Sequence, residues 1–512
     1  MRTEKSLRNV KYSIIGQVVT LFASFIQRTI FIKFLSQDLL GINSLFTNIL
    51  SILSLAELGV GTSITYYLYK PIYEKDETKI TQIMNFFKKI YIIIGWVIFC
   101  LGMLIIPFLS LFIDNIKDYD NIYLIYILFV LNTSISYFFS YDRTLIIANQ
   151  DKYIDALYRY VGYVLLYITQ AIVIIVSKNY ILFLILQIIF TIVENYLISR
   201  KARKDYPYIN NKKLQLEKNE KKEIFKNAKA MMLHKIGWVV VSSTDNLLIS
   251  KFINITLVGI YSNYNMIISA LTTVITQIYN AITASIGNLC ASKEDNNKQE
   301  NIFLKIDFFT YFIYAISTSC LIALFNPFIK LWIGEKYLLS ISTVIIISIS
   351  FYINGMRKSV LAFRDSMGLF YVDRYKSLIE AFLNIVLSIV FAMKFGIDGI
   401  FMGTILSSLL SSSWIEPLVL YKYGFRMKVK NYYKRFIVRF IYLFVIIIIN
   451  YYLVTAISIN SEIFEFCIKV ICSLIVTTTL MIIYSIKNES FKYFVNLFKQ
   501  KIEGIFYGKK KV

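Results

Sequence analysis

The chain has 512 residues, of which 57% are hydrophobic, and its formal net charge is +23. Its mean hydropathy of +0.60 excludes a soluble protein of several domains, because apolar runs near the ~20 residues that span a bilayer recur along its whole length. The basic residues lie mostly in short segments between these runs, which is typical of cytoplasmic loops facing anionic lipid headgroups and argues against nucleic-acid binding.

The apolar runs predict an all-α integral membrane protein with fourteen membrane-spanning helices. In chain order the predicted spans are 12–35, 39–69, 83–112, 121–147, 154–177, 180–199, 229–252, 256–289, 302–330, 338–363, 371–394, 397–421, 435–455 and 462–486. The five cysteines form no Cys-x-x-Cys pair and there is one histidine, so we expect no metal site and no cofactor.

The charges of the connecting segments predict the topology. Residues 200–229 carry eleven Lys and Arg against four Asp and Glu, and residues 422–435 are basic too. The alternate connections, such as 114–120, are short or acidic. Both termini are therefore predicted to be cytoplasmic.

Apolar residues on one face of 488–506 predict a helix on the inner membrane surface, although a frayed basic tail fits the same residues.

An internal repeat sets the predicted architecture. Residues 33–65 align without a gap with residues 251–283 and share eleven identities, which include the pairs Gly41 with Gly259 and Ser44 with Ser262. The shift corresponds to six helices, an even number, so the two halves have the same orientation in the membrane. The sequence therefore predicts two parallel six-helix lobes and two extra C-terminal helices. The predicted segments are a first lobe at 1–203, a cytoplasmic linker at 204–228, a second lobe at 229–422, the two further helices at 423–486 and a basic amphipathic cytoplasmic tail at 487–512.

Polar residues inside the predicted spans are the candidate binding residues. A charge at the centre of a membrane helix costs on the order of 2.5–3.5 kcal/mol, so such residues usually face a cavity or a partner. The first and seventh spans are equivalent in the repeat and carry matching polar faces, which predicts that these faces line a cavity between the lobes. Alternatively, the same polar residues form hydrogen bonds between helices of one lobe. The equivalent positions are Gln17 and Lys235, Thr20 and Trp238, Ser24 and Ser242, and Gln27 and Asp245.

Arg28 is the main candidate cation, because a guanidinium group binds phosphate oxygens in a forked geometry. Lys235 is the second candidate, and Glu57 and Asp245 are candidates for ion coupling or for pairing with Arg28. Gln27, Ser24, Ser242 and Trp238 complete the predicted substrate-binding set.

Four further residues are weaker candidates. Arg143, Arg159 and Arg357 lie nearer the inner ends of their predicted spans, where snorkelling to the headgroups is the alternative. His234 could titrate near neutral pH or could serve a structural role.

Three segments resemble one transporter family. Residues 39–62, with Leu-Gly-Ile-Asn-Ser-Leu-Phe and Ala-Glu-Leu-Gly-Val-Gly-Thr, are similar to the second-helix region of Wzx-type polysaccharide-biosynthesis flippases. Residues 245–262 resemble the seventh-to-eighth helix region of that family, and residues 143–151 resemble the exit of its fourth helix. The family belongs to the multidrug/oligosaccharidyl-lipid/polysaccharide exporter superfamily.

The resemblance implies a flippase of the bacterial plasma membrane that moves an undecaprenyl-pyrophosphate-linked oligosaccharide to the outer leaflet by alternating access, without covalent chemistry. Besides this lipid-linked oligosaccharide, the expected partners are membrane lipids, a polysaccharide polymerase and glycosyltransferases. A drug/cation antiporter of the same superfamily is an alternative, although such proteins usually have twelve helices. A membrane glycosyltransferase or polymerase is a further alternative, but the outer loops are too short for a catalytic loop, and nothing positive favours a passive scaffold.

Overall fold

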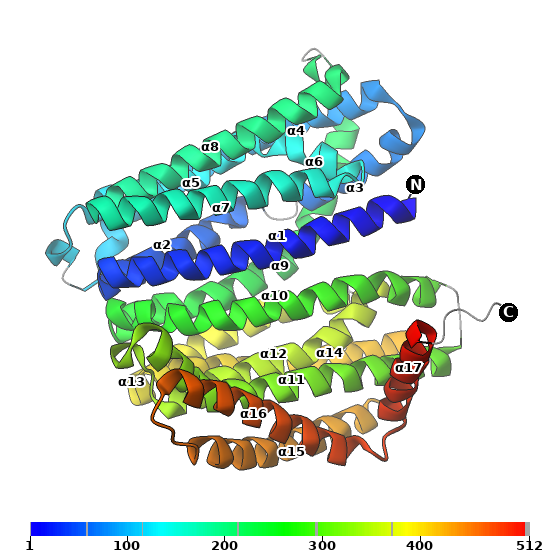
Figure 1. The fold of residues 1–512 in the computed structure, drawn as a ribbon. Coiled ribbons are helices and arrows are strands. Elements are labelled where there is room, and N and C mark those ends of the chain that lie inside the picture. Colours follow the sequence, from blue (N-terminus) through cyan, green and yellow to red (C-terminus); the bar gives the residue numbers. More distant parts are fainter. Residues whose placement is uncertain are drawn as a thin grey trace. The chain divides into compact units, whose positions relative to one another are not determined.

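The computed structural model describes residues 2–57, 60–114, 116–211, 214–291, 295–369 and 372–506. Over these ranges the regular secondary structure is helical, and the helices pack into two compact units, Met1–Ser262 and Asn263–Val512 (Figure 1). The predicted all-α class is therefore confirmed.

The first unit contains α1 to α9 and the beginning of α10. The helices are α1 (Arg2–Phe34), α2 (Gln37–Leu53), α3 (Val60–Glu74), α4 (Glu77–Ile105), α5 (Ile122–Phe139), α6 (Tyr141–Ala148), α7 (Lys152–Ser177), α8 (Tyr180–Asp205), α9 (Lys218–Phe252) and α10 (Ile255–Ala291), with the 3-10 turns η1 (Ser54–Glu57), η2 (Ile106–Leu111), η3 (Ile116–Asp118) and η4 (Pro207–Asn210). Within this unit α1 packs along α7, α4 along α5, α5 along α8, and α2 along α9.

Two of the predicted spans are interrupted in this unit. The predicted span 39–69 is divided by η1, and helix resumes at Val60. The side chain of Ser54 donates a hydrogen bond of 2.8 Å to the carbonyl of Leu50, four residues earlier, which is a contact that often bends helices. The predicted span 121–147 is divided in the same way between α5 and α6.

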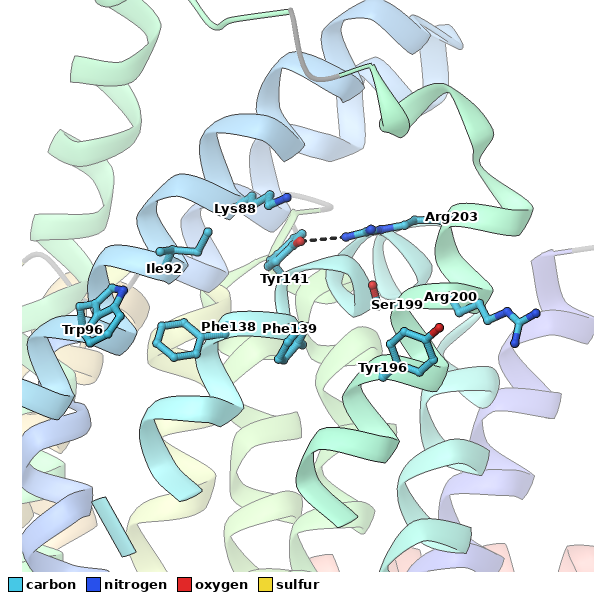
Figure 2. Close-up of a pocket in the computed structure, with 10 residues that line it drawn as sticks. All are labelled: Lys88, Ile92, Trp96, Phe138, Phe139, Tyr141, Tyr196, Ser199, Arg200 and Arg203. Atoms are coloured by element: carbon cyan, nitrogen blue, oxygen red, sulfur yellow. Dashed lines mark hydrogen bonds between the residues drawn. The ribbon is translucent and has the colours of Figure 1, made fainter. Parts of the chain in front are cut away.

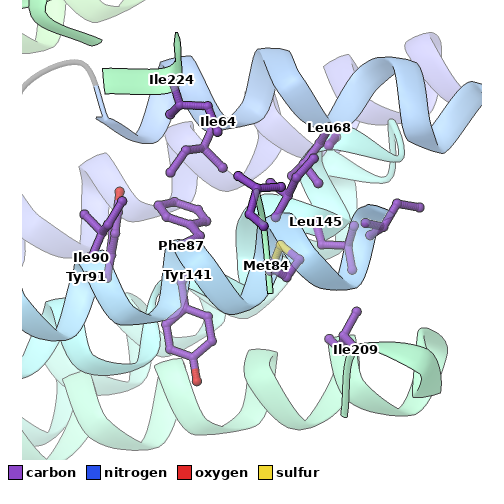
Figure 3. Packing of buried hydrophobic residues seen from close by; sticks show 14 of the residues in the cluster. Ile64, Leu68, Met84, Phe87, Ile90, Tyr91, Tyr141, Leu145, Ile209 and Ile224 are labelled. Atoms are coloured by element: carbon purple, nitrogen blue, oxygen red, sulfur yellow. The ribbon is translucent and has the colours of Figure 1, made fainter. Parts of the chain in front are cut away.

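An apolar cluster holds together one end of the first unit, where α3, α4, α6 and η4 meet (Figure 3). Ile64, Leu68, Phe87 and Leu145 are fully buried in it. Because lipid tails are as apolar as these side chains, their close packing, rather than escape from water, stabilises such a contact inside a membrane. The cluster fixes the start of α4 against the segment that follows α8.

The second unit contains the remainder of α10 and all later helices. These are α11 (Asn296–Ile333), α12 (Ile341–Ser366), α13 (Lys376–Leu410), α14 (Ser412–Val419), α15 (Lys430–Thr455), α16 (Glu462–Ser485) and α17 (Glu489–Phe506), together with the 3-10 turn η5 (Glu335–Tyr337) and the π-helical turn η7 (Leu420–Phe425). Within this unit α11 packs along α12, α15 and α16.

The element α13 is two helices joined at Gly396. The φ of Gly396 is +59° and its ψ is −134°, a conformation that only glycine adopts readily. Gly399 and Gly403 let the second half approach the backbone of the first, because an added Cβ would lie 2.1 Å from the carbonyl oxygen of Phe391 and 2.4 Å from the amide nitrogen of Ser388, respectively. Small residues spaced four positions apart often lie at the contact between two membrane helices. The turn falls at the predicted boundary between the spans 371–394 and 397–421.

The predicted C-terminal helix is present as α17. Its phenylalanines pack on α11, with ring centroids 6.4 Å apart for Phe491 and Phe308 and 5.4 Å apart for Phe494 and Phe309. Part of the apolar face of α17 therefore packs against α11.

The chain is a multi-pass membrane protein by the length and composition of its helices. Ten helical segments within the described ranges are long and apolar enough to cross a bilayer. The count of fourteen spans remains a prediction, because Lys376–Phe425 counts once although it covers two predicted spans, and α2, α3, α9 and α10 are not among the ten.

Candidate functional site

Arg28 lies within the candidate membrane span of α1 and has a hydroxyl partner. Its guanidinium donates a hydrogen bond of 2.6 Å to Oγ of Ser262 on α10. That hydroxyl donates in turn to the carbonyl of Gly259 at 2.7 Å, so the backbone of α10 orients it. Tyr180 of α8 is close enough to interact electrostatically with Arg28. The Arg28 side chain of α1 thus interacts with groups from two other helices, α8 and α10.

The crossing of α2 and α10 lies one helical turn from Ser262 and is nearly symmetric. An added Cβ on Gly41 would lie 2.0 Å from the carbonyl oxygen of Ile255, and one on Gly259 would lie 2.5 Å from the carbonyl oxygen of Gln37. Gln37 and Ile255 are equivalent in the internal repeat, as are Gly41 and Gly259. Each glycine therefore faces the same backbone position on the other copy of the repeated helix.

A side-chain hydrogen bond closes the same crossing, in which the hydroxyl of Thr256 donates to the carboxylate of Asp38. These two residues are also equivalent in the repeat. The two copies differ beyond the crossing, because α2 ends at Leu53 whereas α10 continues to Ala291.

The predicted polar stripe of α1 is divided between different environments. Tyr160 of α7 donates a hydrogen bond of 3.1 Å to Oε1 of Gln17, which is a contact between helices of one unit. Ser24 donates to the carbonyl of Leu21 in its own helix at 2.7 Å, and Gln27 is half-buried. Gln17 therefore makes a hydrogen bond between helices, whereas Ser24 bonds within its own helix.

The corresponding residues of α9 are described only in part. Ser242 is exposed and donates to the carbonyl of Val239 in its own helix at 3.1 Å. Asp245 is half-buried and close enough to Tyr261 to interact electrostatically. The side chains of the other three candidates, Lys235, Trp238 and His234, lie outside the described residues.

Glu57 is held by two tyrosines rather than by Arg28. Its carboxylate accepts hydrogen bonds from the hydroxyls of Tyr91 on α4, at 2.5 Å, and Tyr137 on α5, at 3.3 Å. Gly61 leaves room for this contact, because an added Cβ would lie 2.8 Å from the Tyr91 hydroxyl. The sequence indicated the carboxylate but not its partners, which come from helices that follow it in the chain.

The weaker arginine candidates belong to ion clusters. In the first unit the guanidinium of Arg143 contacts Glu194 at 2.7 Å and Asp155 at 3.3 Å, and Arg159 contacts Asp155 at 3.3 Å. Only 16% of the Arg143 side chain is exposed, so ion pairing replaces the snorkelling considered for it. Arg159, with 39% exposed, keeps partial access to the surroundings.

A second cluster in the other unit contains Arg357. Its guanidinium contacts Glu416 at 2.8 Å and Glu380 at 2.9 Å, and the fully buried Glu416 also pairs with Lys376. Arg364 contacts Asp373 at 2.7 Å in the same region. Arg357 and Arg364 are therefore paired rather than extended toward headgroups.

The two clusters share one equivalent position of the repeat, which is Asp155 in the first half and Asp373 in the second. Arg143, Asp155 and Glu194 lie on α6, α7 and α8, and Arg364, Asp373 and Glu416 lie on α12, at the start of the fifth helix of the second half, and on α14. Each unit thus carries an arginine, an aspartate and a glutamate in this region, although Arg364 and Glu416 lie three and four residues beyond the positions equivalent to Arg143 and Glu194.

A family model described as polysaccharide biosynthesis protein matches residues 6–284, which is more than half of the chain. No curated protein matches the sequence.

Solved membrane transporters share the fold. The lipid II flippase MurJ in an inward closed conformation has a TM-score of 0.61 at 16% identity, and the match covers 93% of this chain and 98% of that one. A multidrug resistance transporter of the MATE family, in an inward-facing conformation, has a TM-score of 0.63 at 15% identity, covering 82% and 99%. A MOP-superfamily transporter from Pyrococcus furiosus has a TM-score of 0.57 at 13% identity, covering 84% and 96%.

Proposed function

We propose that the chain, which belongs to the polysaccharide biosynthesis protein family, is a flippase for an undecaprenyl-pyrophosphate-linked oligosaccharide. It moves this lipid from the inner to the outer leaflet of the bacterial plasma membrane by alternating access, for surface polysaccharide synthesis. The family, and a fold shared with a lipid flippase over 93% of the chain, support this proposal.

The observation that carries the proposal is the partly buried Arg28 within a membrane span, bonded to a neutral hydroxyl. A guanidinium has five N–H donors, and hydrogen bonds to a charged acceptor are about twice as strong as bonds to a neutral one. A pyrophosphate oxygen would therefore be a stronger acceptor than the Ser262 hydroxyl for this guanidinium and would displace that hydroxyl. Such a replacement would loosen the contact of α1 with α10 beside the Gly41–Gly259 crossing, and it would link substrate binding to the movement of these helices.

The reaction proposed is translocation without covalent chemistry, so the chain is not proposed to be an enzyme and needs no cofactor. Glycosyltransferases would supply the lipid-linked oligosaccharide on the inner side, and a polymerase would use it on the outer side. The basic segment 200–229 supports a cytoplasmic position for the connection after α8 and for both termini.

A drug/cation antiporter is the second candidate, because the MATE transporter has a TM-score close to that of the flippase. The coverage favours the flippase, whose structure accounts for 93% of this chain against 82% for the MATE transporter. The predicted cationic substrate site also suits a pyrophosphate better than an organic cation.

Proteoliposomes separate these two functions. Purified protein would be reconstituted with a fluorescent undecaprenyl-pyrophosphate oligosaccharide, and outer-leaflet exposure would be followed by a membrane-impermeant lectin or quencher. The same vesicles, loaded with an organic cation, would be tested for efflux under proton and sodium gradients. We expect translocation of the lipid and no cation efflux. Cation efflux without lipid translocation would contradict the proposal.

A further inference from the structure

A cavity of about 660 Å³ lies in the first unit between α4, α5, α6 and α8. Its lining is polar at one end and apolar at the other (Figure 2). The lining residues are Lys88, Ile92, Trp96, Phe138, Phe139, Tyr141, Tyr196, Ser199, Arg200 and Arg203. None of them belongs to the substrate-binding set proposed above.

The basic end of the cavity is built around Tyr141. Figure 2 shows Lys88 above this residue and Arg203 to its right, and Arg203 donates a hydrogen bond of 2.9 Å to its hydroxyl. The Nε of Arg203 also donates to Asp142 at 3.0 Å, and the carboxylate of Asp142 is nearly fully buried. These bonds fix the guanidinium at the rim while 41% of the Arg203 side chain stays exposed.

The charge at this end is positive in sum. Among the lining residues, Lys88, Arg200 and Arg203 are cations and none is a carboxylate, and Asp142 outside the lining bonds to Arg203. Arg200 is exposed at the edge of the cavity. A guanidinium with unused N–H donors and a neighbouring ammonium suit an anionic phosphate group.

The apolar end follows from helical spacing. Lys88, Ile92 and Trp96 are four residues apart and share one face of α4, so about 12 Å separate the cation from the indole along the axis. Trp96 and Phe139 are exposed to the surroundings of the span, where lipid tails lie. The cavity therefore joins a phosphate-binding end to a surface that acyl chains contact.

The position along the chain indicates the leaflet. The start of α4 is tied to the segment after α8, where the side-chain amide of Asn85 donates to the carbonyl of Asn211 at 2.8 Å and that of Leu214 at 3.0 Å. This segment is part of the basic connection 200–229, which the charge pattern places on the cytoplasmic side. Basic pockets between membrane helices on that side bind anionic lipid headgroups.

We propose that this cavity binds one anionic phospholipid of the inner leaflet, with its phosphate between Lys88 and Arg203 and its acyl chains along Ile92 and Trp96. The lipid is a bound membrane component, separate from the translocated substrate. It joins α4 to α8 at the end of the unit where the apolar cluster of Figure 3 packs.

Native mass spectrometry of the delipidated full chain tests this site. The protein would be titrated with phosphatidylglycerol, phosphatidylethanolamine, undecaprenyl phosphate and inorganic phosphate in separate arms. We expect one phosphatidylglycerol to bind at least tenfold more tightly than phosphatidylethanolamine. The double variant Lys88→Ala/Arg200→Ala should bind it about 30-fold more weakly, at about fivefold for each cation removed.

The control variant Lys70→Ala/Lys204→Ala removes two exposed lysines near the same end of the unit and outside the cavity. It should bind phosphatidylglycerol as the unmodified chain does. If the double variant does not fold, the single variant Arg200→Glu replaces it, because the Arg200 side chain is exposed. Arg200→Glu should weaken phosphatidylglycerol binding more than Lys204→Glu.

Four results would overturn the proposal. They are equal binding by the cavity and control variants, equal binding of the two phospholipids, displacement of phosphatidylglycerol by millimolar inorganic phosphate, and preferential binding of undecaprenyl phosphate, which would make the cavity part of the substrate path.

Discussion

Gly41 of α2 and Gly259 of α10 are equivalent in the internal repeat, and each faces the backbone of the other's helix at a distance too short for a Cβ atom. The two positions are identical in the sequence alignment for a physical reason, because a side chain on either would push the helices apart. The crossing also brings Ser262 to Arg28. Its integrity is therefore expected to matter for stability and for transport.

Gly259→Ala should destabilise the first unit despite the better helix propensity of alanine. The added Cβ would lie 2.5 Å from a backbone oxygen that cannot move independently, and overpacking of this kind costs about 1–3 kcal/mol. Gly287→Ala in the same helix is the control, because an added Cβ there has nothing within 4 Å. Thermal unfolding in detergent should show a lower midpoint for Gly259→Ala and an equal or higher one for Gly287→Ala.

A disulfide between α2 and α10 should stop transport reversibly if the crossing opens in each cycle. In a cysteine-free background, Asp38→Cys/Thr256→Cys replaces two side chains that are already hydrogen-bonded. Oxidation should abolish lipid translocation and reduction should restore it. The pair Asn85→Cys/Asn211→Cys, which links α4 to the segment after α8, should leave the rate unchanged. Normal translocation by the oxidised first pair would show that the crossing stays closed.

Removing the carboxylate of Glu416 should destabilise the second unit strongly. Glu416 is fully buried between Arg357 and Lys376, and loss of one partner of a buried ion pair costs about 3–5 kcal/mol. Glu416→Gln should therefore lower the unfolding midpoint, whereas Glu462→Gln, at an exposed helix start, should not. Arg357→Met/Glu416→Met removes both charges and should cost less than the two single changes together. Additive costs would mean that the ion pair contributes no coupling energy.

Much of the fold could be predicted from composition and periodicity. The all-helical membrane class, which hydropathy indicated, is confirmed. The polysaccharide-biosynthesis family and the transporter fold, which the resemblance of three segments implied, are confirmed too. The turn at Gly396 and the helix α17 also agree with the predicted boundaries. The break at Ser54–Glu57 does not, because uninterrupted apolar character hides a local loss of helical hydrogen bonding.

The side-chain clusters were less predictable. Glu57 was singled out as an intramembrane acid, but its partners Tyr91 and Tyr137 lie 34 and 80 residues further along the chain. The pairing of Lys376 with Glu416 depends in the same way on how α13 and α14 pack. A single sequence shows which residues carry charge and not which charges meet. The substrate-binding set around Arg28 therefore remains a prediction.

The translocation rate of the Arg28→Ala variant tests the central claim most directly. Reconstituted Arg28→Ala should move the undecaprenyl-pyrophosphate oligosaccharide about 10- to 100-fold more slowly, because one or two charge-assisted hydrogen bonds are lost. Arg28→Lys should retain part of the rate, and Lys33→Ala, which removes an exposed cation near the same end of α1, should retain all of it. Full translocation by correctly inserted Arg28→Ala protein would contradict the account.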